Sequence, residues 1–219
     1  MKSSHLIPIF ICAISASVIG STHSRASPIL LTNGSFEFGP PPEFDSFQTE
    51  AAGSTNITGW LVNSGDVDWI FNYWQPSDGQ RSLDMNGNMP GSISQTIQTT
   101  PGTSYQIEFD LAGNPDWGTT KTLRVAAGNY TQGYSFDSTP HSLANMGWAR
   151  QTMLFMASDH ETTIEFGSTT DIGTGVYGPA LDNVSVMAVT VPEPSTFAMF
   201  LAGLGLLGFM AKRSKPISA

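Results

Sequence analysis

The central part of the chain, residues 27–190, consists of short β-type runs and contains no long amphipathic helical stretch. Clusters of Gly, Asn, Pro and Asp separate these runs, as is typical of strands joined by turns. So many short strands predict an all-β fold, an antiparallel β-sandwich of the jelly-roll type. The expected strands are residues 29–31, 57–62, 67–71, 81–85, 92–98, 104–111, 122–127, 133–136, 149–156, 162–166 and 180–188.

Alternation within these runs indicates which side chains face the core, because successive strand residues point to opposite faces. In residues 104–111, Ile107 and Phe109 share the apolar face. In the last run, Asp182 shares a face with Val184 and Val186. A carboxylate that faces the core must be satisfied by backbone N–H groups or by a cation.

The first 26 residues are typical of a secretory signal peptide, expected as a helix that is later removed. Lys2 provides a positive start, Leu6 to Gly20 is apolar, and Ser24-Arg25-Ala26 places small residues at the cleavage site. Cleavage after Ala26 leaves a domain of residues 27–190, which is long enough for one sizeable core.

The C-terminal segment, residues 191–219, carries Pro192, Glu193 and Pro194, then an apolar run at residues 197–211, then a basic cluster. As a helix the run spans about 22 Å, short for a hydrocarbon core of about 30 Å. A plain C-terminal membrane anchor is one interpretation. The order of features also resembles the PEP-CTERM sorting signal of Gram-negative bacteria. That resemblance implies export across the inner membrane, transient anchoring, removal of the tail by an exosortase, and delivery to the cell surface or extracellular matrix.

Residues 27–190 contain 17 acidic and four basic side chains, so their formal charge is −13. A surface of this sign repels phosphate backbones, which excludes nucleic acid as the expected partner. The single cysteine, Cys12, lies in the signal peptide, so the mature domain has no disulfide and no thiolate metal site. Calcium, which needs only oxygen ligands, remains compatible.

Several phrases of the mature domain occur in an order that resembles one bacterial family. They are Asn33-Gly34-Ser35-Phe36-Glu37, Gly59-Trp60, Val67-Asp68-Trp69-Ile70, Ser82 to Gly87, Ser94-Gln95-Thr96, Tyr105 with Phe109 to Pro115, Met146-Gly147-Trp148 and Gly178 to Val184. Together they resemble the choice-of-anchor C proteins, relatives of the DUF642 domains of plant cell walls. The resemblance spans residues 29–186 and implies a galactose-binding-like sandwich, with polysaccharide as the ligand class of the plant relatives.

The two ends of the domain also resemble those of jelly-roll carbohydrate-binding modules that hold a structural calcium. Carried over to this sequence, the resemblance makes Glu37 and Asp182 the candidate calcium ligands. The alternative is that both carboxylates cap turns or bond backbone amides where the first and last strands meet.

Catalysis is not expected. Only His141 and His160 remain after removal of the signal peptide, and no Gly-x-Ser-x-Gly elbow is present. The carboxylate pairs Asp66/Asp68 and Glu108/Asp110 have i, i+2 spacing that a glycosidase could use. In so acidic a domain, solvated strand faces explain both pairs more simply.

Aromatic residues are the candidate ligand surface, because sugar rings stack on them and polar neighbours bond the hydroxyl groups. Trp74 and Trp117 lie in turn-rich segments, where a ring is more easily exposed. Their polar neighbours complete the candidate site: Asn72, Asp78, Asn114 and Asp116. The sequence thus predicts a surface-sorted, non-catalytic module that binds extracellular or cell-envelope polysaccharide. The alternative is a structural matrix or adhesion protein that binds another protein.

Overall fold

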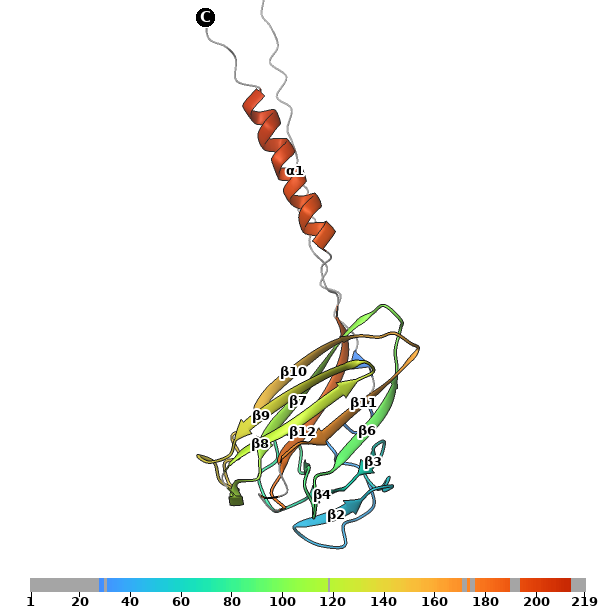
Figure 1. Ribbon diagram of the computed structural model, residues 1–219, viewed down its shortest axis with the longest axis vertical. Helices are drawn as coiled ribbons and strands as arrows, with labels where there is room; N and C mark the ends of the chain where they lie inside the picture. Colours follow the sequence, from blue (N-terminus) through green and yellow to red (C-terminus); the bar gives the residue numbers. More distant parts are fainter. Residues whose placement is uncertain are drawn as a thin grey trace, which may run out of the picture.

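The computed structural model describes residues 28–29, 31–117, 119–170, 173, 176–189 and 194–213; for 28, 29, 194–198 and 211–213 it describes the backbone alone. The expected signal peptide and the sorting-motif residues Pro192 and Glu193 lie outside this set. Two antiparallel sheets face each other as a sandwich (Figure 1), which confirms the predicted fold class.

The larger sheet has seven strands in the order β10-β7-β12-β5-β4-β2, with β1 paired to β12. Its strands are β1 (Pro28–Ile29), β2 (Phe47–Ala51), β4 (Asp66–Ile70), β5 (Ser82–Asp84), β7 (Ser104–Gly113), β10 (Ala149–Met156) and β12 (Pro179–Val189). The smaller sheet has five strands in the order β3-β6-β11-β8-β9. They are β3 (Leu61–Ser64), β6 (Ser92–Gln98), β8 (Thr120–Ala127), β9 (Tyr130–Asp137) and β11 (Glu161–Ser168).

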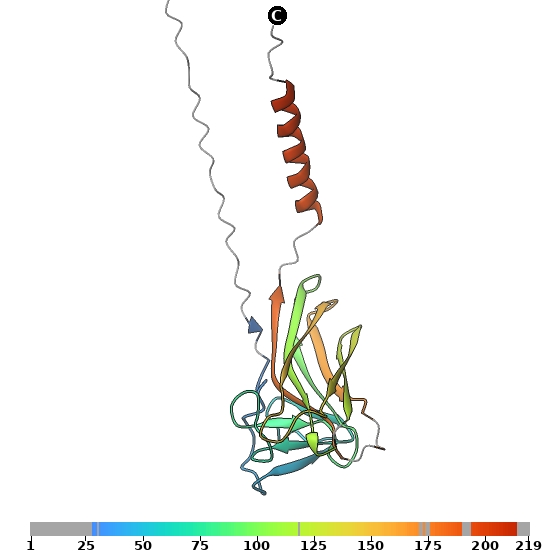
Figure 2. The same cartoon turned by 90° about the vertical axis from the view of Figure 1, so that its left-hand side faces the viewer.

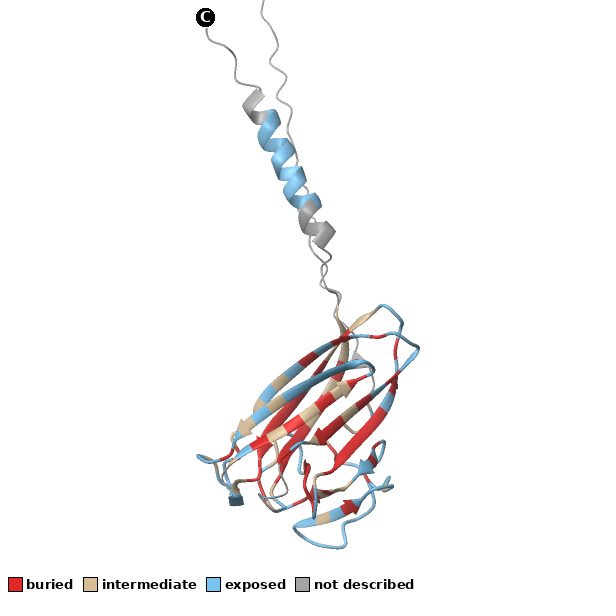
Figure 3. Ribbon diagram, viewed as in Figure 1, coloured by how far each residue is buried: buried red, intermediate tan, exposed pale blue. Residues whose placement is uncertain are grey.

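The main core lies between the two sheets, and buried residues alternate with accessible ones along many strands (Figure 3). Ile107 and Phe109 are fully buried there, as the alternation predicts. Trp60 and Trp69 are also core residues, and each indole N–H donates to a backbone carbonyl, at 3.0 and 2.9 Å. Burial of these rings therefore leaves no indole N–H unpaired.

Two elements differ from the sequence prediction. Strand β2 is not predicted, because Phe-Gln-Thr-Glu-Ala contains few strand-forming residues; its pairing with β4 forms it. Residues 57–60 are a turn, not the start of a strand. Gly59 has a φ of 87°, and the Trp60 N–H donates to the Ile57 carbonyl at 2.9 Å. The strand that follows begins only at Leu61.

A β-bulge in β12 changes the side of the sheet on which the Asp182 side chain lies. Asp182 pairs with Asp110, and the register shifts before Ser185 pairs with Glu108. Asn183 supplies the extra residue with a φ of 51°, a left-handed conformation that Asn tolerates better than most residues. Asp182 therefore faces the outer side of the seven-stranded sheet while Val186 faces the core, so the prediction that they share a face is wrong.

Loops cover part of this outer side. A second apolar cluster forms where the segments near Trp74 and Met146 pack on β4, β7 and β12; its buried members are Ile70, Trp74, Ala112, Met146 and Ala180. The sheet is thus buried on both faces in this region.

Helix α1 (Pro194–Arg213) begins at the last residue of the Pro-Glu-Pro motif, and proline is favoured in the first turn of a helix. The side chains of residues 199–210 are all exposed, so they contribute nothing to the sandwich core. Among the described residues, no helix is both long and apolar enough to cross a membrane. The predicted membrane span at residues 197–211 is therefore not confirmed. β1 and the end of β12 lie at one pole of the sandwich and β2 at the other (Figure 2).

Candidate functional site

Two aspartates lie side by side on the outer face of the seven-stranded sheet. Asp68 of β4 pairs in register with Asp84 of β5. Asp84 also pairs with Ala180 of β12, which in turn pairs with Ala112 of β7. The two carboxylates line a small space on this face of the sheet.

This space is a cavity of about 60 Å³. Its walls come from β2, β4, β5 and the loops around them, and its lining residues are Phe47, Asp68, Ile70, Tyr73, Asp84, Asn114, Val176 and Tyr177. A water molecule occupies about 30 Å³ of liquid, so the cavity accommodates only a few polar atoms of a ligand.

Asp84 forms the floor of the cavity and is almost completely buried. Its carboxylate accepts hydrogen bonds from the Asn86 N–H (3.0 Å), the Gly178 N–H (2.9 Å) and the Asn114 side-chain amide (2.8 Å). Burial, with a smaller contribution from the nearby Asp68 charge, raises the pKa of Asp84 to about 8 against the effect of these donors. Loss of water is the dominant cause because the charged form is poorly solvated there.

Asp68 accepts a hydrogen bond from the Thr49 hydroxyl at 2.6 Å. Burial, with the nearby Asp66 charge, raises the pKa of Asp68 to about 6, although the Thr49 bond opposes the shift. Asp68 and Asp84 are thus two hydrogen-bonding groups of weakened acidity at the floor of one cavity.

Aromatic rings form the rim. The rings of Phe47 and Tyr73 meet edge to face at 5.7 Å between centroids. The rings of Trp117 and Tyr177 lie nearly parallel, with 6.4 Å between centroids and 5° between planes. The Tyr73 hydroxyl donates a short hydrogen bond to Asp116, which joins one part of the rim to the segment that carries Trp117.

Trp117 ends the short 3-10 helix η1 (Pro115–Trp117), and its side chain is 53% exposed. Its backbone carbonyl accepts a hydrogen bond from the Lys121 ammonium at 2.9 Å. Lys121 is fully buried, and burial lowers its pKa. A buried cation therefore holds the backbone beneath the exposed indole.

Three of the six predicted ligand residues meet at this cavity. Asn114 lines it, Asp116 bonds the rim tyrosine, and Trp117 stacks on Tyr177.

The other three do not line it. Trp74 is only 5% exposed and donates to the Ser82 hydroxyl at 2.8 Å, so the predicted exposure of its ring is wrong. The Asn72 side chain donates to the Asp45 carbonyl at 3.0 Å, and Asp78 accepts from the Ser35 hydroxyl at 2.7 Å. Both side chains fasten loops together.

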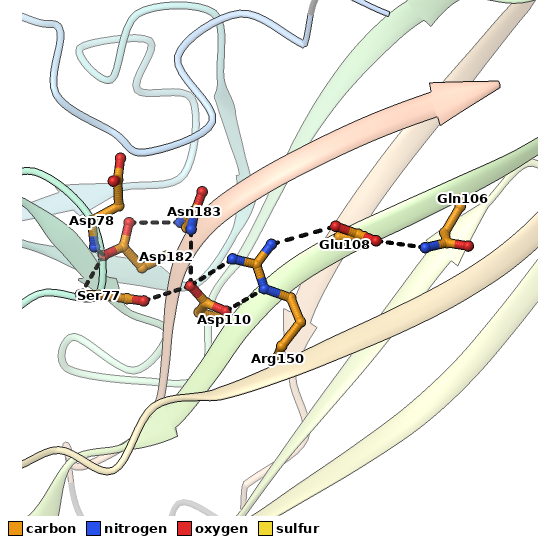
Figure 4. Close-up of polar contacts among 8 residues, drawn as sticks. All are labelled: Ser77, Asp78, Gln106, Glu108, Asp110, Arg150, Asp182 and Asn183. Atoms are coloured by element: carbon orange, nitrogen blue, oxygen red, sulfur yellow. Dashed lines mark hydrogen bonds and ion pairs between the residues drawn. The ribbon is translucent and has the colours of Figure 1, made fainter. Parts of the chain in front are cut away.

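The two predicted calcium ligands hold one loop. Asp182 accepts from the backbone N–H groups of Ser77 (2.7 Å) and Asp78 (2.9 Å) through one oxygen and from that of Asn183 through the other (Figure 4). Burial raises the pKa of Asp182 to about 7.

Glu37 acts on the same loop, because its Oε1 accepts from the N–H groups of Gln80 and Arg81, both at 2.8 Å. Backbone N–H donors are the wrong partners for a cation, so these contacts fit the alternative role in backbone bonding. Within the described residues, no group of three or more His, Cys, Asp or Glu side chains could hold a metal ion. Calcium binding stays a prediction.

The paired carboxylates considered for catalysis have partners. Arg150 lies 2.6 Å from Asp110 and 3.5 Å from Glu108 (Figure 4). Asp66 accepts from the Asn88 and Met89 N–H groups, at 2.6 and 3.0 Å, and so caps a turn. Asp66, Glu108 and Asp110 thus have structural partners, whereas Asp68 lines the cavity.

Sequence reasoning missed the Asp68–Asp84 pair and the rings of Phe47, Tyr73 and Tyr177. One local signal existed: residues 84–88 and 110–114 both run from Asp to Gly-Asn. The two segments meet in the structure, where Asn114 donates to Asp84. The rest of the cavity depends on which strands pair, and the sequence does not reveal that pairing.

The fold and the site define a jelly-roll-like β-sandwich with an aromatic-rimmed acidic cavity on the outer face of one sheet. The chain belongs to the DUF642 family, described as proteins of unknown function, whose profile matches residues 29–187. Residues 190–214 match the PEP-CTERM protein-sorting motif. The predicted DUF642 relationship and sorting signal are thus confirmed, while the choice-of-anchor C identification stays a prediction.

The chain is 32% identical over 194 residues to halomucin of Haloquadratum walsbyi. The match covers 85% of this chain but only 2% of halomucin. Among solved structures, an arabinose-bound α-L-arabinofuranosidase matches with a TM-score of 0.51 and 12% identity, over 76% of this chain and 27% of that one. A family 35 carbohydrate-binding module from Clostridium thermocellum matches with a TM-score of 0.44 and 13% identity, over 64% of this chain and 97% of that module. At such identities the structural likeness concerns the fold alone.

Proposed function

We propose that this DUF642 domain is a non-catalytic carbohydrate-binding module and that its sugar site is the aromatic-rimmed cavity. The observation that carries the proposal is the combination of exposed rings with buried hydrogen-bonding groups. Trp117 and Tyr177 provide a flat face for the C–H side of a sugar ring. Asp68, Asp84 and Asn114 provide partners for its hydroxyl groups.

The size of the cavity limits what enters it. A space of about 60 Å³ accommodates the hydroxyl groups at one edge of a sugar, while the ring itself rests on the rim. This arrangement suits a sugar that presents adjacent hydroxyl groups.

The charge of the site favours an uncharged ligand. None of the described residues that line the cavity is basic, and two are aspartates. A uronate, sulfate or phosphate would meet these carboxylates without a cation to pair with it. Neutral polysaccharide is therefore the proposed ligand class.

The sorting motif indicates where in the cell this binding would take place. It implies export and processing by an exosortase-type enzyme, with residues 197–211 holding the chain at the membrane before processing. Strand β2, which contributes Phe47 to the cavity, lies at the pole opposite the end of β12. A domain tethered by its C-terminus would then present the cavity toward extracellular polysaccharide.

One observation favours the alternative, a matrix or adhesion protein with a protein partner. Leu154 and Met156 of β10 are both more than half exposed on the outer face of the seven-stranded sheet. Adjacent apolar side chains of this kind are common in protein interfaces.

A binding screen of residues 27–190 distinguishes the two functions. This fragment contains the whole sandwich, whose core needs none of the described α1 side chains. We expect retention on neutral polysaccharides such as galactan, xylan or cellulose, weaker retention on polygalacturonate, and weaker retention of the Trp117→Ala variant on the neutral polysaccharides. Stronger binding to polygalacturonate would contradict the proposed charge preference. Failure to bind any of them, with capture of a matrix protein lost in Leu154→Ser, would favour the alternative.

A further inference from the structure

A second and larger hollow adjoins the cavity. It has a volume of about 660 Å³ and is lined by residues 43–49. Phe47 lines both spaces, and Thr49, which lines the larger one, bonds Asp68 on the floor of the smaller one. The two hollows are therefore neighbours that share the wall formed by β2.

The larger hollow carries its own exposed ring. Phe44 is 64% exposed, and the acidic side chains of Glu43 and Asp45 flank it. An aromatic ring beside carboxylates repeats the combination found at the rim and floor of the smaller cavity.

The loop that carries Phe44 is fixed at both ends. Before it, the Phe38 N–H donates to the Asn33 side chain at 3.0 Å, and the Phe38 carbonyl accepts from Thr58 at 3.0 Å. After it, the Ser46 carbonyl accepts from the Phe71 N–H at 2.9 Å. Three consecutive prolines, residues 40–42, restrict the backbone between these anchors. The backbone that carries the exposed ring is thus restricted before a ligand arrives, which lowers the entropic cost of binding.

We propose that the two hollows are consecutive subsites for one linear, uncharged polysaccharide chain; this inference rests on the carbohydrate-binding function proposed above. The smaller cavity takes the hydroxyl edge of one sugar. The larger hollow, whose volume lies within the range of small-molecule sites, takes the next sugar and stacks it on Phe44. One sugar occupies each space in this arrangement, so the domain recognises the chain and not an isolated monosaccharide.

Chain-length dependence of affinity tests this inference. Residues 27–190 would be titrated calorimetrically with mono- to hexasaccharides of the cello-, xylo- and β-1,4-galacto- series. We expect affinity to rise between one and three sugar units in the series that binds. Phe44→Ala should lower the affinity for the trisaccharide about 2- to 12-fold, which is the effect expected from the loss of one aromatic contact. It should leave the affinity for the monosaccharide unchanged.

Phe38→Ala is the matched control, because Phe38 is 67% exposed in the same loop but lines neither hollow. It should leave all affinities unchanged, and both variants should keep the wild-type melting temperature. Equal affinity for mono- and hexasaccharide would overturn the chain inference while leaving the proposed function intact, and so would equal behaviour of the two phenylalanine variants. Absence of binding throughout all three series would overturn the proposed function and the inference with it.

Discussion

Trp74 and Trp117 occupy similar turn-rich sequence, yet the structure predicts opposite effects when each is replaced by alanine. Trp74 is 5% exposed, packs in the second apolar cluster and bonds the buried Ser82 hydroxyl. Trp117 is 53% exposed, and its ring stacks on that of Tyr177. Trp74→Ala should therefore lower the stability of the domain, whereas Trp117→Ala should weaken ligand binding.

The size of the stability loss follows from burial. A buried aromatic side chain removes about 150–250 Å² from water, and large-to-small replacement of such a ring costs about 3–5 kcal/mol. For a domain of this size, each kcal/mol shifts the melting temperature by about 2–4 °C, so Trp74→Ala should lower it by about 6–20 °C. Trp117→Ala should leave it nearly unchanged and weaken binding of a neutral oligosaccharide about 2- to 12-fold.

Differential scanning calorimetry and titration of the same two proteins provide the assay. Trp74→Phe is a useful third protein, because it keeps a buried ring but loses the bond to Ser82 and part of the ring volume, so its stability should lie between those of wild type and Trp74→Ala. Equal melting temperatures for the two alanine variants would refute the assignment of Trp74 to the core. A large loss of stability in Trp117→Ala would refute its role as an exposed platform.

Three further predictions concern charge and processing. Burial raises the pKa values of Asp68, Asp182 and Asp84 to about 6, 7 and 8, above the value of 3.8 for an unperturbed Asp. Their favourable contribution is complete below about pH 3.8 and is lost as pH rises toward these folded-state values. The melting temperature should therefore fall between about pH 4 and pH 8, less steeply in Asp84→Asn; a rise over that interval would contradict this. If Glu37 and Asp182 bind calcium, calcium should stabilise the wild-type domain relative to chelator by about 2.7 kcal/mol at a hundredfold excess over Kd, and Asp182→Ala should abolish the effect; an unchanged melting temperature would support the backbone-bonding role of both carboxylates. Surface protein recovered from producing cells should lack residues 197–215, which mass spectrometry of the C-terminal peptide determines; retention of that segment would indicate a permanent anchor.

Strand alternation predicts the inner faces of the sandwich well, because burial of one face imposes a period of two on the sequence. Ile107 and Phe109 show this directly. The rule fails at Asn183, where one inserted residue changes the facing of Asp182; nothing in Leu-Asp-Asn-Val-Ser distinguishes a bulge from a regular strand.

The candidate site is less predictable because its parts come from distant segments. Trp74 becomes buried through packing with Met146, which lies 72 residues further along the chain. Asp68 and Asp84 meet only because β4 pairs with β5. Local reasoning finds Trp117 and Asn114, because both lie in one turn. That turn exposes the Trp117 ring, and its Asp116 N–H donates to the Asn114 side chain. Contacts within a few residues are visible in the sequence, whereas those that depend on strand order are not.

The pairing of β1 with β12 has a consequence for how such a domain is used in longer proteins. Pro28 lies opposite Met187 and Ile29 opposite Val186, so the chain enters and leaves the sandwich at adjacent points. A unit with neighbouring ends can be inserted into a loop of another protein, or joined to copies of itself, with little distortion of its host. The segment of halomucin that matches this chain makes up only 2% of that protein, so a related sequence lies within a far longer chain.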